Sequence, residues 1–210
     1  MSEYRMTQET IPERSYRGMT SEERRAQRRE QLIKAAINVY GETGYRQATI
    51  KAVCAAAGLT ERYFYESFGN SEELLVASFQ IVTQQMHRAL SAVGHAPHPS
   101  RMHRVSAMLH AYFSTLKQDP KSARVFLVEI RGVSPAMDAA FEASVSTLGD
   151  GLARATGRQG AGKSLLSAGV AGGVIQIALC WIANGYRPSL KSVVDSAAEL
   201  VMVMADRQES

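Results

Sequence analysis

The chain of 210 residues is 45% hydrophobic and 21% charged, which excludes a wholly disordered polypeptide and leaves enough apolar material for a sizeable core. Its formal net charge of +4 permits an anionic partner without requiring one, because residues 1–75 carry eleven basic and eleven acidic side chains. Cys54 and Cys180 lie far apart in apolar stretches, so neither a disulfide framework nor a zinc cluster is expected. Residues 1–30 are almost entirely polar and contain no signal-peptide pattern, and we therefore expect a cytoplasmic protein.

The apolar periodicity predicts an all-α fold of about nine helices, with no convincing strand pattern. Residues 1–20 lack periodicity and are expected to form a flexible N-terminal arm. Glycines, prolines and N-cap residues then divide the chain into helices predicted over residues 21–42, two short segments beginning after Thr49 and Thr60, a longer helix to about residue 93, and helices over 101–118, 121–131, 136–156, 163–184 and 190–206. At the start of the long helix, Asn70 and Glu73 have the spacing of a capping box.

The two short segments have the pattern of a helix-turn-helix. In the first, Val53 and Cys54 fall on one apolar face, and Gly58 supplies the left-handed backbone conformation that the turn needs. In the second, Phe64 and Phe68 are four residues apart and are predicted to face inward. This leaves an outward face that includes two tyrosines, which is unusual for a helix that only meets solvent: Thr60, Glu61, Arg62, Tyr63 and Tyr65.

The stretch ATIKAVCAAAGLTERYFYESFGNSEELL, together with QLIKAAINVYGETGY before it, resembles the N-terminal domain of the TetR family of repressors. The resemblance extends over residues 24–75, and beyond that only in the number and spacing of helices. It implies a helix-turn-helix DNA-binding domain over residues 21–75, followed by a larger helical domain over residues 76–210 that binds a small effector and dimerises. The expected function is a DNA-binding transcriptional regulator, a repressor that leaves its operator when the effector binds.

The resemblance also assigns roles within the motif. Thr49 matches a helix-start residue that touches a phosphate, and Thr60 matches the residue that opens the recognition helix. Arg62 and Tyr63 fall where the family reads base edges, and Tyr65 falls where a tyrosine pairs with the phosphate backbone.

Other residues complete the predicted DNA-binding surface. Lys51 is included in it, and Glu61 either accepts a hydrogen bond from a cytosine amino group or caps its own helix. Ser67 and Ser71 stand where the family often has histidine and lysine, so one phosphate contact is missing. We expect Arg28 and Arg29, in the cluster from Arg24 to Arg29, to compensate, although a solvated charged face explains that cluster equally well.

Two further patterns suggest chemistry that their surroundings in the sequence disfavour. Residues 157–164 match the phosphate-binding pattern GxxxxGK[ST], which would make the protein a nucleotide-binding enzyme, but no strand precedes them and no enzyme activity is expected. The five histidines fall within 24 residues, yet their spacing does not suit zinc, so no metal site and no cofactor are predicted: His87, His95, His98, His103 and His110.

In the larger domain, candidate effector-binding residues are the aromatic and polar side chains Phe113, Phe126, Glu129, Arg131, Trp181 and Asn184. The apolar segment 168–183 is too short for a membrane span and is predicted to be a buried helix, so no membrane partner is expected. The last two helices lie where the TetR family dimerises, which implies a homodimer on a near-palindromic operator. Three alternatives stay open, namely a nucleotide-binding enzyme through residues 157–164, a ligand-binding protein that has lost DNA affinity, and an activator.

Overall fold

The computed structural model describes residues 20–94, 96–157 and 165–206, and within these ranges it contains helices and no strand. The helical elements are α1 (Ser21–Thr43), η1 (Tyr45–Gln47), α2 (Ile50–Ala57), α3 (Glu61–Tyr65), α4 (Ser71–Gly94), α5 (Arg101–Gln118), α6 (Pro120–Arg124), η2 (Val125–Glu129), α7 (Pro135–Ala155), α8 (Leu165–Ala183) and α9 (Leu190–Asp206). The all-α prediction of about nine helices is confirmed for these residues. One helix expected over residues 121–131 is instead α6 followed by η2, a single π-helical segment. The predicted arm lies mostly outside the described residues.

Side-chain caps fix the starts of the N-terminal helices. The Thr20 hydroxyl accepts a hydrogen bond from the backbone of Glu23, whose carboxylate in turn accepts one from the Thr20 backbone, and this forms a capping box for α1. Asn70 caps α4 by accepting from the Glu73 backbone at 2.9 Å, but the Glu73 carboxylate accepts from Gly69 rather than from Asn70. The capping box predicted for α4 is therefore displaced by one residue.

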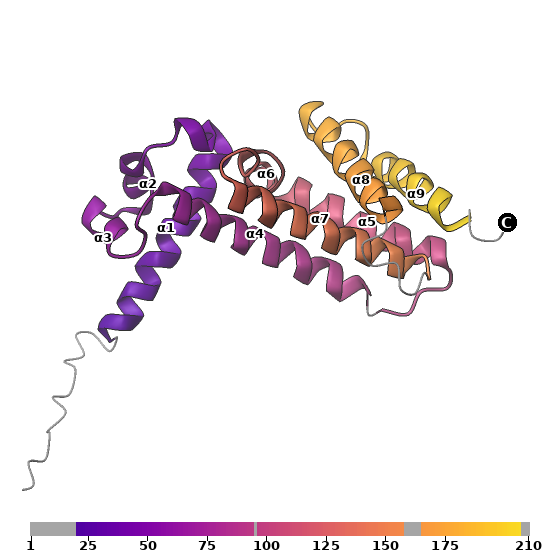
Figure 1. The fold of residues 1–210 in the computed structure, drawn as a ribbon, viewed down its shortest axis with the longest axis horizontal. Coiled ribbons are helices and arrows are strands. Elements are labelled where there is room, and N and C mark those ends of the chain that lie inside the picture. Colours follow the sequence, from indigo (N-terminus) through magenta and orange to yellow (C-terminus); the bar gives the residue numbers. More distant parts are fainter. Residues whose placement is uncertain (1–19, 95, 158–164, 207–210) are drawn as a thin grey trace, which may run out of the picture.

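The helices form a small N-terminal group and a larger bundle, and α4 links the two (Figure 1). Helices α1, α2 and α3 lie at one end of the molecule, and α4 extends from them along the bundle of α5, α7, α8 and α9. The buried core is continuous across both parts, and its largest fully buried side chains include Tyr40, Phe64, Tyr112, Phe113 and Trp181. The helix-turn-helix segments α2 and α3 thus lie at one end of the molecule and share its buried core with the bundle.

The two parts of the molecule also meet at α6 and η2, in a contact that we call the interdomain junction. The Glu129 carboxylate accepts a hydrogen bond from the Tyr45 backbone at 2.7 Å and pairs with Arg124 Nε at 2.7 Å. Arg124 also donates to the carbonyls of Gly41 and Glu42 at the end of α1. Gly41 lies so close to the backbone of Lys121 that a Cβ atom at position 41 would overlap it. The end of α1 is therefore held directly against α6.

Candidate DNA interface and effector cavity

The α2–α3 motif is fixed by its turn and by buried side chains. Gly58 adopts a left-handed conformation with φ of 67°, and the backbone of Leu59 donates to the Cys54 carbonyl at 2.9 Å. Val53, Cys54 and Phe64 are each at most 2% exposed, and Phe68 is 4% exposed. The predicted inward face is therefore confirmed, and the crossing of α2 and α3 is set by packing rather than by charge.

The residues predicted to contact DNA lie on the outside of this motif. Thr49 caps α2 through its hydroxyl, which accepts from the Ala52 backbone at 3.1 Å, whereas Thr60 precedes α3 without a side-chain cap. The Arg62 side chain is 84% exposed and Tyr65 is 58% exposed. Thr49, Lys51, Thr60 and Glu61 are also exposed, whereas Tyr63 is half-buried. Their contacts with DNA stay a prediction.

Glu66, at the end of α3, is a residue that the sequence did not single out. Its carboxylate pairs with Arg62 at 3.2 Å and with Arg28 at 3.4 Å, and its backbone carbonyl accepts from Arg25 at 2.5 Å. Two of these partners lie on α1, about one third of the way along that helix. Glu66 therefore joins α1 to α3 and also contacts the arginine that is predicted to read bases.

Arg28 and Arg29 both lie against aromatic rings of the motif. The Arg28 guanidinium is 4.5 Å from the centroid of the Tyr63 ring, and that of Arg29 is 4.8 Å from the centroid of the Phe68 ring. The Arg28 side chain is only 23% exposed. These arginines therefore help to position α3, and the prediction that they contact phosphates stays untested. Ser71, in the place of the missing lysine, is 3.3 Å from the Tyr45 hydroxyl.

A large cavity lies at the far end of the bundle from the α2–α3 motif, between the ends of α4, α5 and α7. Its volume is about 780 Å³. The polar side chains that line it include His87, His98, Arg104 and Arg154, and apolar lining comes from Leu90, Met108 and neighbouring residues. None of the described lining residues is acidic. This size lies within the range of pockets that hold small molecules.

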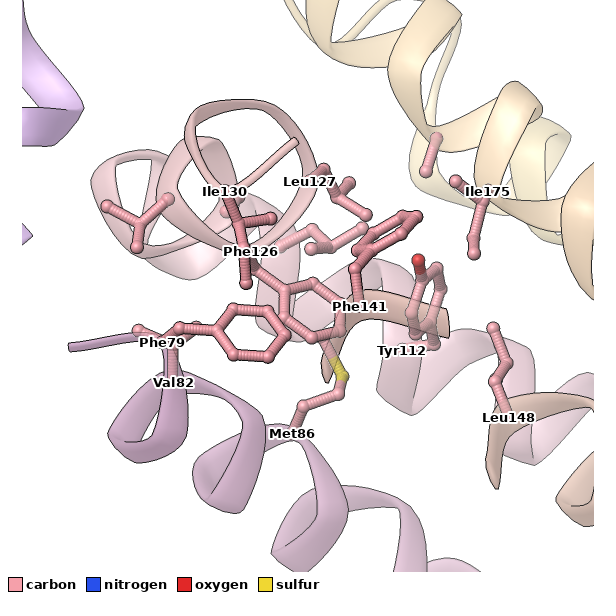
Figure 2. Close-up of a cluster of buried hydrophobic side chains, with 14 of the residues drawn as sticks. Phe79, Val82, Met86, Tyr112, Phe126, Leu127, Ile130, Phe141, Leu148 and Ile175 are labelled. Carbon is pink, nitrogen blue, oxygen red and sulfur yellow. The ribbon is translucent and has the colours of Figure 1, made fainter. Parts of the chain in front are cut away.

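A narrow crevice of about 10 Å³ lies beside this cavity, and His87 and Leu90 line both spaces. Its other lining residues are Met86, Tyr112, Phe126, Ser144, Val145, Leu148 and Ile175, several of which Figure 2 shows converging on one apolar cluster. The Tyr112 hydroxyl is buried without a hydrogen-bond partner among the described residues. Burial raises the pKa of Tyr112, so this hydroxyl stays protonated at neutral pH.

The six predicted effector residues do not gather at one cavity. Phe126 lines the crevice and stacks on Phe79 at 5.8 Å between ring centroids. Glu129 belongs to the interdomain junction. Phe113 packs edge-on against Trp181, whose indole Nε1 donates to the Pro188 carbonyl at 2.8 Å. The other two predicted residues, Arg131 and Asn184, are exposed. Only Phe126 among the six lines either the cavity or the crevice.

The described residues do not supply the surroundings that the two disfavoured sites require. Gly157 follows helix α7 rather than a strand, and residues 158–164 of the phosphate-binding pattern lie outside the described residues. No group of three or more His, Cys, Asp or Glu side chains in the described ranges could hold a metal ion. His95 lies outside those ranges, and the Nε2 of His98 contacts the Val93 carbonyl at 3.1 Å.

Helix α8 is long and apolar enough, by length and composition alone, to cross a membrane. One side packs against α7 and α9, with Val174, Ala178 and Trp181 buried, but other positions are exposed. Leu165 is 92% exposed, Leu166 is 42% exposed, and Val203 on the neighbouring α9 is 58% exposed. The buried helix expected over residues 168–183 is therefore buried on one side only.

Comparison with known proteins identifies the N-terminal segment. Residues 32–77 match the family model described as bacterial regulatory proteins of the tetR family. The chain is 26% identical over 181 residues to the transcriptional activator FasR of Mycolicibacterium smegmatis, and this match covers 83% of the chain and 80% of FasR. It is 29% identical over 90 residues to the transcriptional regulator BetI of Brucella suis, covering 41% of the chain and less than half, 43%, of BetI.

Solved structures share the whole fold. FadR from Bacillus subtilis, determined in complex with stearoyl-CoA, superposes with a TM-score of 0.67 over 82% of the chain and 96% of FadR, at 21% identity. A TetR-like regulator from Rhodococcus superposes with a TM-score of 0.65 over 86% of the chain and 94% of that protein, also at 21% identity. The arrangement of an N-terminal helix-turn-helix and a larger helical part is therefore one that known regulators adopt.

Proposed function

Because the chain belongs to the TetR family of DNA-binding transcriptional regulators, we propose that it acts as a homodimeric repressor whose operator affinity falls when a small molecule occupies the cavity between α4, α5 and α7. The observation that carries the proposal is the outward face of α3, where Arg62 and Tyr65 are exposed. The opposite face of α3 is fixed by buried side chains such as Phe64. No catalytic activity forms part of this proposal, and such a regulator works in the cytoplasm, where its DNA is.

The chemistry of this face suits the major groove. Arg62 offers a two-pronged donor to guanine, and Tyr63 lies next to it for contact with a base edge or a thymine methyl group. Thr49, Lys51, Thr60 and Tyr65 are available to donate to phosphate oxygens, and Glu61 can accept from a cytosine amino group. The assignment of base-reading residues to α3 and of phosphate contacts to its neighbours is part of the proposal.

DNA binding is tested by fluorescence anisotropy with the full chain and a duplex covering the promoter region of its own gene. The Arg62→Ala, Tyr63→Ala double variant should bind that duplex about ten- to a hundredfold more weakly, because one good base contact contributes about 1–3 kcal/mol. Arg88→Ala, which removes an exposed arginine from the C-terminal half of α4, is the matched control and should bind as the wild type does. Unchanged affinity in the double variant would overturn the assignment.

We place the dimer interface on α8 and α9. Of the seven exposed large hydrophobic side chains among the described residues, three lie on these two helices, namely Leu165, Leu166 and Val203. Exposed apolar side chains concentrated on adjacent helices are costly in a monomer, and a second copy that packs α8 and α9 against α8 and α9 would bury them. A twofold dimer of this kind presents two α3 helices about 34 Å apart to a near-palindromic site.

The interface is tested by measuring mass in solution by light scattering. Leu165→Glu with Val203→Glu should shift the protein from dimer to monomer at micromolar concentration, because two charges per copy would be buried without partners. Ile81→Glu, which alters an exposed apolar residue of α4, is the control and should leave the dimer intact. A double variant that stays dimeric would move the interface elsewhere.

We also propose that the protein represses transcription rather than activating it. FasR, which resembles the chain over most of its length, is an activator. Transcription in vitro from the chain's own promoter distinguishes the two directions, since a repressor lowers transcript yield as protein is added and an activator raises it. If transcript yield rises, the protein is still a DNA-binding regulator, but it is an activator rather than a repressor.

A further inference from the structure

The charge of the large cavity's lining is of one sign. Arg104, from the first turn of α5, and Arg154, from the last turn of α7, both line it, together with His87 and His98. The described lining includes no carboxylate that could neutralise these side chains. A cavity of this kind favours a negatively charged group and disfavours a cation.

Both arginines retain donors for a ligand. Arg104 donates to the Ala155 carbonyl at 3.4 Å, which is long for a hydrogen bond, and this contact leaves most of its guanidinium free. Neither Arg104 nor Arg154 pairs with an acidic side chain in the described part of the chain. Guanidinium groups bind carboxylate and phosphate oxygens through paired N–H donors, so this end of the cavity has the chemistry of an anion site.

The opposite end of the cavity leads into apolar surroundings. His87 and Leu90 line both the cavity and the crevice, so these two side chains stand at the boundary between the two spaces. Beyond that point the crevice lies between Met86, Leu148 and Ile175, which converge in Figure 2. The crevice is nearly closed, but the unbranched side chain of Met86 can change rotamer at low cost to admit a slender group. A branched or bulky ring system would require the surrounding helices to separate.

From this arrangement we infer that the effector is an anionic amphiphile, with its charged head between Arg104 and Arg154 and an unbranched apolar tail that passes His87 and Leu90 into the crevice. The inference rests on the proposed function in taking this cavity as the effector site. A free long-chain carboxylate and an acyl thioester of a phosphorylated carrier share this chemistry, because each joins a negative head to a hydrocarbon chain.

Tail insertion would act on the element that holds the DNA-binding domain. Phe126 lines the crevice, and Glu129 of the interdomain junction follows it by three residues in the same π-helical segment. A tail that displaces Phe126 from its stack on Phe79 would shift η2 and weaken the contact of Glu129 with Tyr45. The ligand would then prefer the conformation in which the junction is altered, which is the condition for coupling to DNA affinity.

The test is calorimetric titration of the full-length dimer, without DNA, using four probes at concentrations where they do not form micelles. The probes are dodecanoate, dodecanoyl-CoA, hexanoate and dodecylammonium. Dodecanoate or dodecanoyl-CoA should bind, and whichever binds more tightly identifies the source of the head group. Hexanoate should bind at least tenfold more weakly because it lacks most of the tail, and dodecylammonium should not bind because its head is cationic.

Matched variants locate the head group. Arg104→Gln with Arg154→Gln should weaken binding of the anionic probe at least tenfold, whereas Arg88→Gln, outside the cavity lining, should leave it unchanged. Equal binding of dodecylammonium and dodecanoate, insensitivity to the double variant, or no binding of either anionic probe would overturn the inference. Since no DNA is present, these failures are separate from failure of the proposed function, which would appear as loss of promoter binding by the unliganded wild type.

Discussion

Replacement of Glu129 by alanine should destabilise the protein by an amount that the interdomain junction allows us to work out. The side chain of Glu129 is 10% exposed and accepts two hydrogen bonds, from the Tyr45 backbone and from Arg124, each at 2.7 Å. A part-buried backbone N–H that loses its only acceptor costs about 1–3 kcal/mol. Arg124 is 39% exposed and can turn to water, so its lost ion pair contributes only about 1 kcal/mol.

The expected decrease in the free energy of unfolding for Glu129→Ala is therefore about 2–4 kcal/mol. Glu129→Gln keeps an oxygen for the Tyr45 N–H and loses only the ion pair, so it should cost about 1 kcal/mol. The assay is urea unfolding followed by circular dichroism at one fixed protein concentration, because the proposed dimer would make stability depend on concentration.

Glu142→Ala, at an exposed position of α7, serves as the control and should change the free energy of unfolding by less than about 0.5 kcal/mol. Two results would refute the reasoning. Either Glu129→Ala proves as stable as the control, or Glu129→Gln destabilises as much as Glu129→Ala, which would show that the Tyr45 N–H does not depend on this oxygen.

Three other predictions follow from contacts described above. Glu66→Gln should tighten promoter binding about three- to tenfold at low salt, because it removes a carboxylate that competes with the DNA bases for Arg62 and that repels the phosphate backbone; weaker binding in an anisotropy titration would mean that Glu66 serves mainly to hold α3. Arg28→Ala should weaken binding while leaving the slope of log affinity against log salt unchanged, since Arg28 stacks on Tyr63; a slope reduced by about one would instead reveal a direct phosphate contact. Tyr112→Phe should raise the free energy of unfolding by about 1 kcal/mol, because it removes a buried hydroxyl that has no partner, and a lower melting temperature would contradict this.

Local sequence signals were sufficient for the helices and for the inner face of the DNA-binding motif. Thr49 and Gly58 mark the ends of α2 by their own chemistry, and Phe64 and Phe68 share a face because of helical periodicity, so neighbours along the chain determine both. The division of residues 120–129 into α6 and a π-helical segment has no such local signal, since it depends on how η2 fits against α1 and α4.

The candidate sites depend on contacts that span the sequence. Glu66 and Arg28 are 38 residues apart in the sequence, so no local motif could predict that they pair. The effector residues expected from sequence were three aromatic and three polar side chains, and two of the aromatics pack in the core instead: Trp181 lies between Phe113 and Tyr186, with its indole N–H bonded to a carbonyl. The cavity is lined instead by side chains that are ordinary in sequence and that only the convergence of α4, α5 and α7 brings together.

The close approach of Gly41 to Lys121 fixes the angle at which the N-terminal helices leave the bundle. A side chain of even one carbon at position 41 would overlap the backbone of α6, so the end of α1 would have to pivot away from the bundle. In the proposed dimer, each α3 helix would move with it, in opposite directions on the two copies. Variants selected for operators with longer or shorter spacers between half-sites should therefore carry substitutions at Gly41, which lies outside the α2–α3 motif.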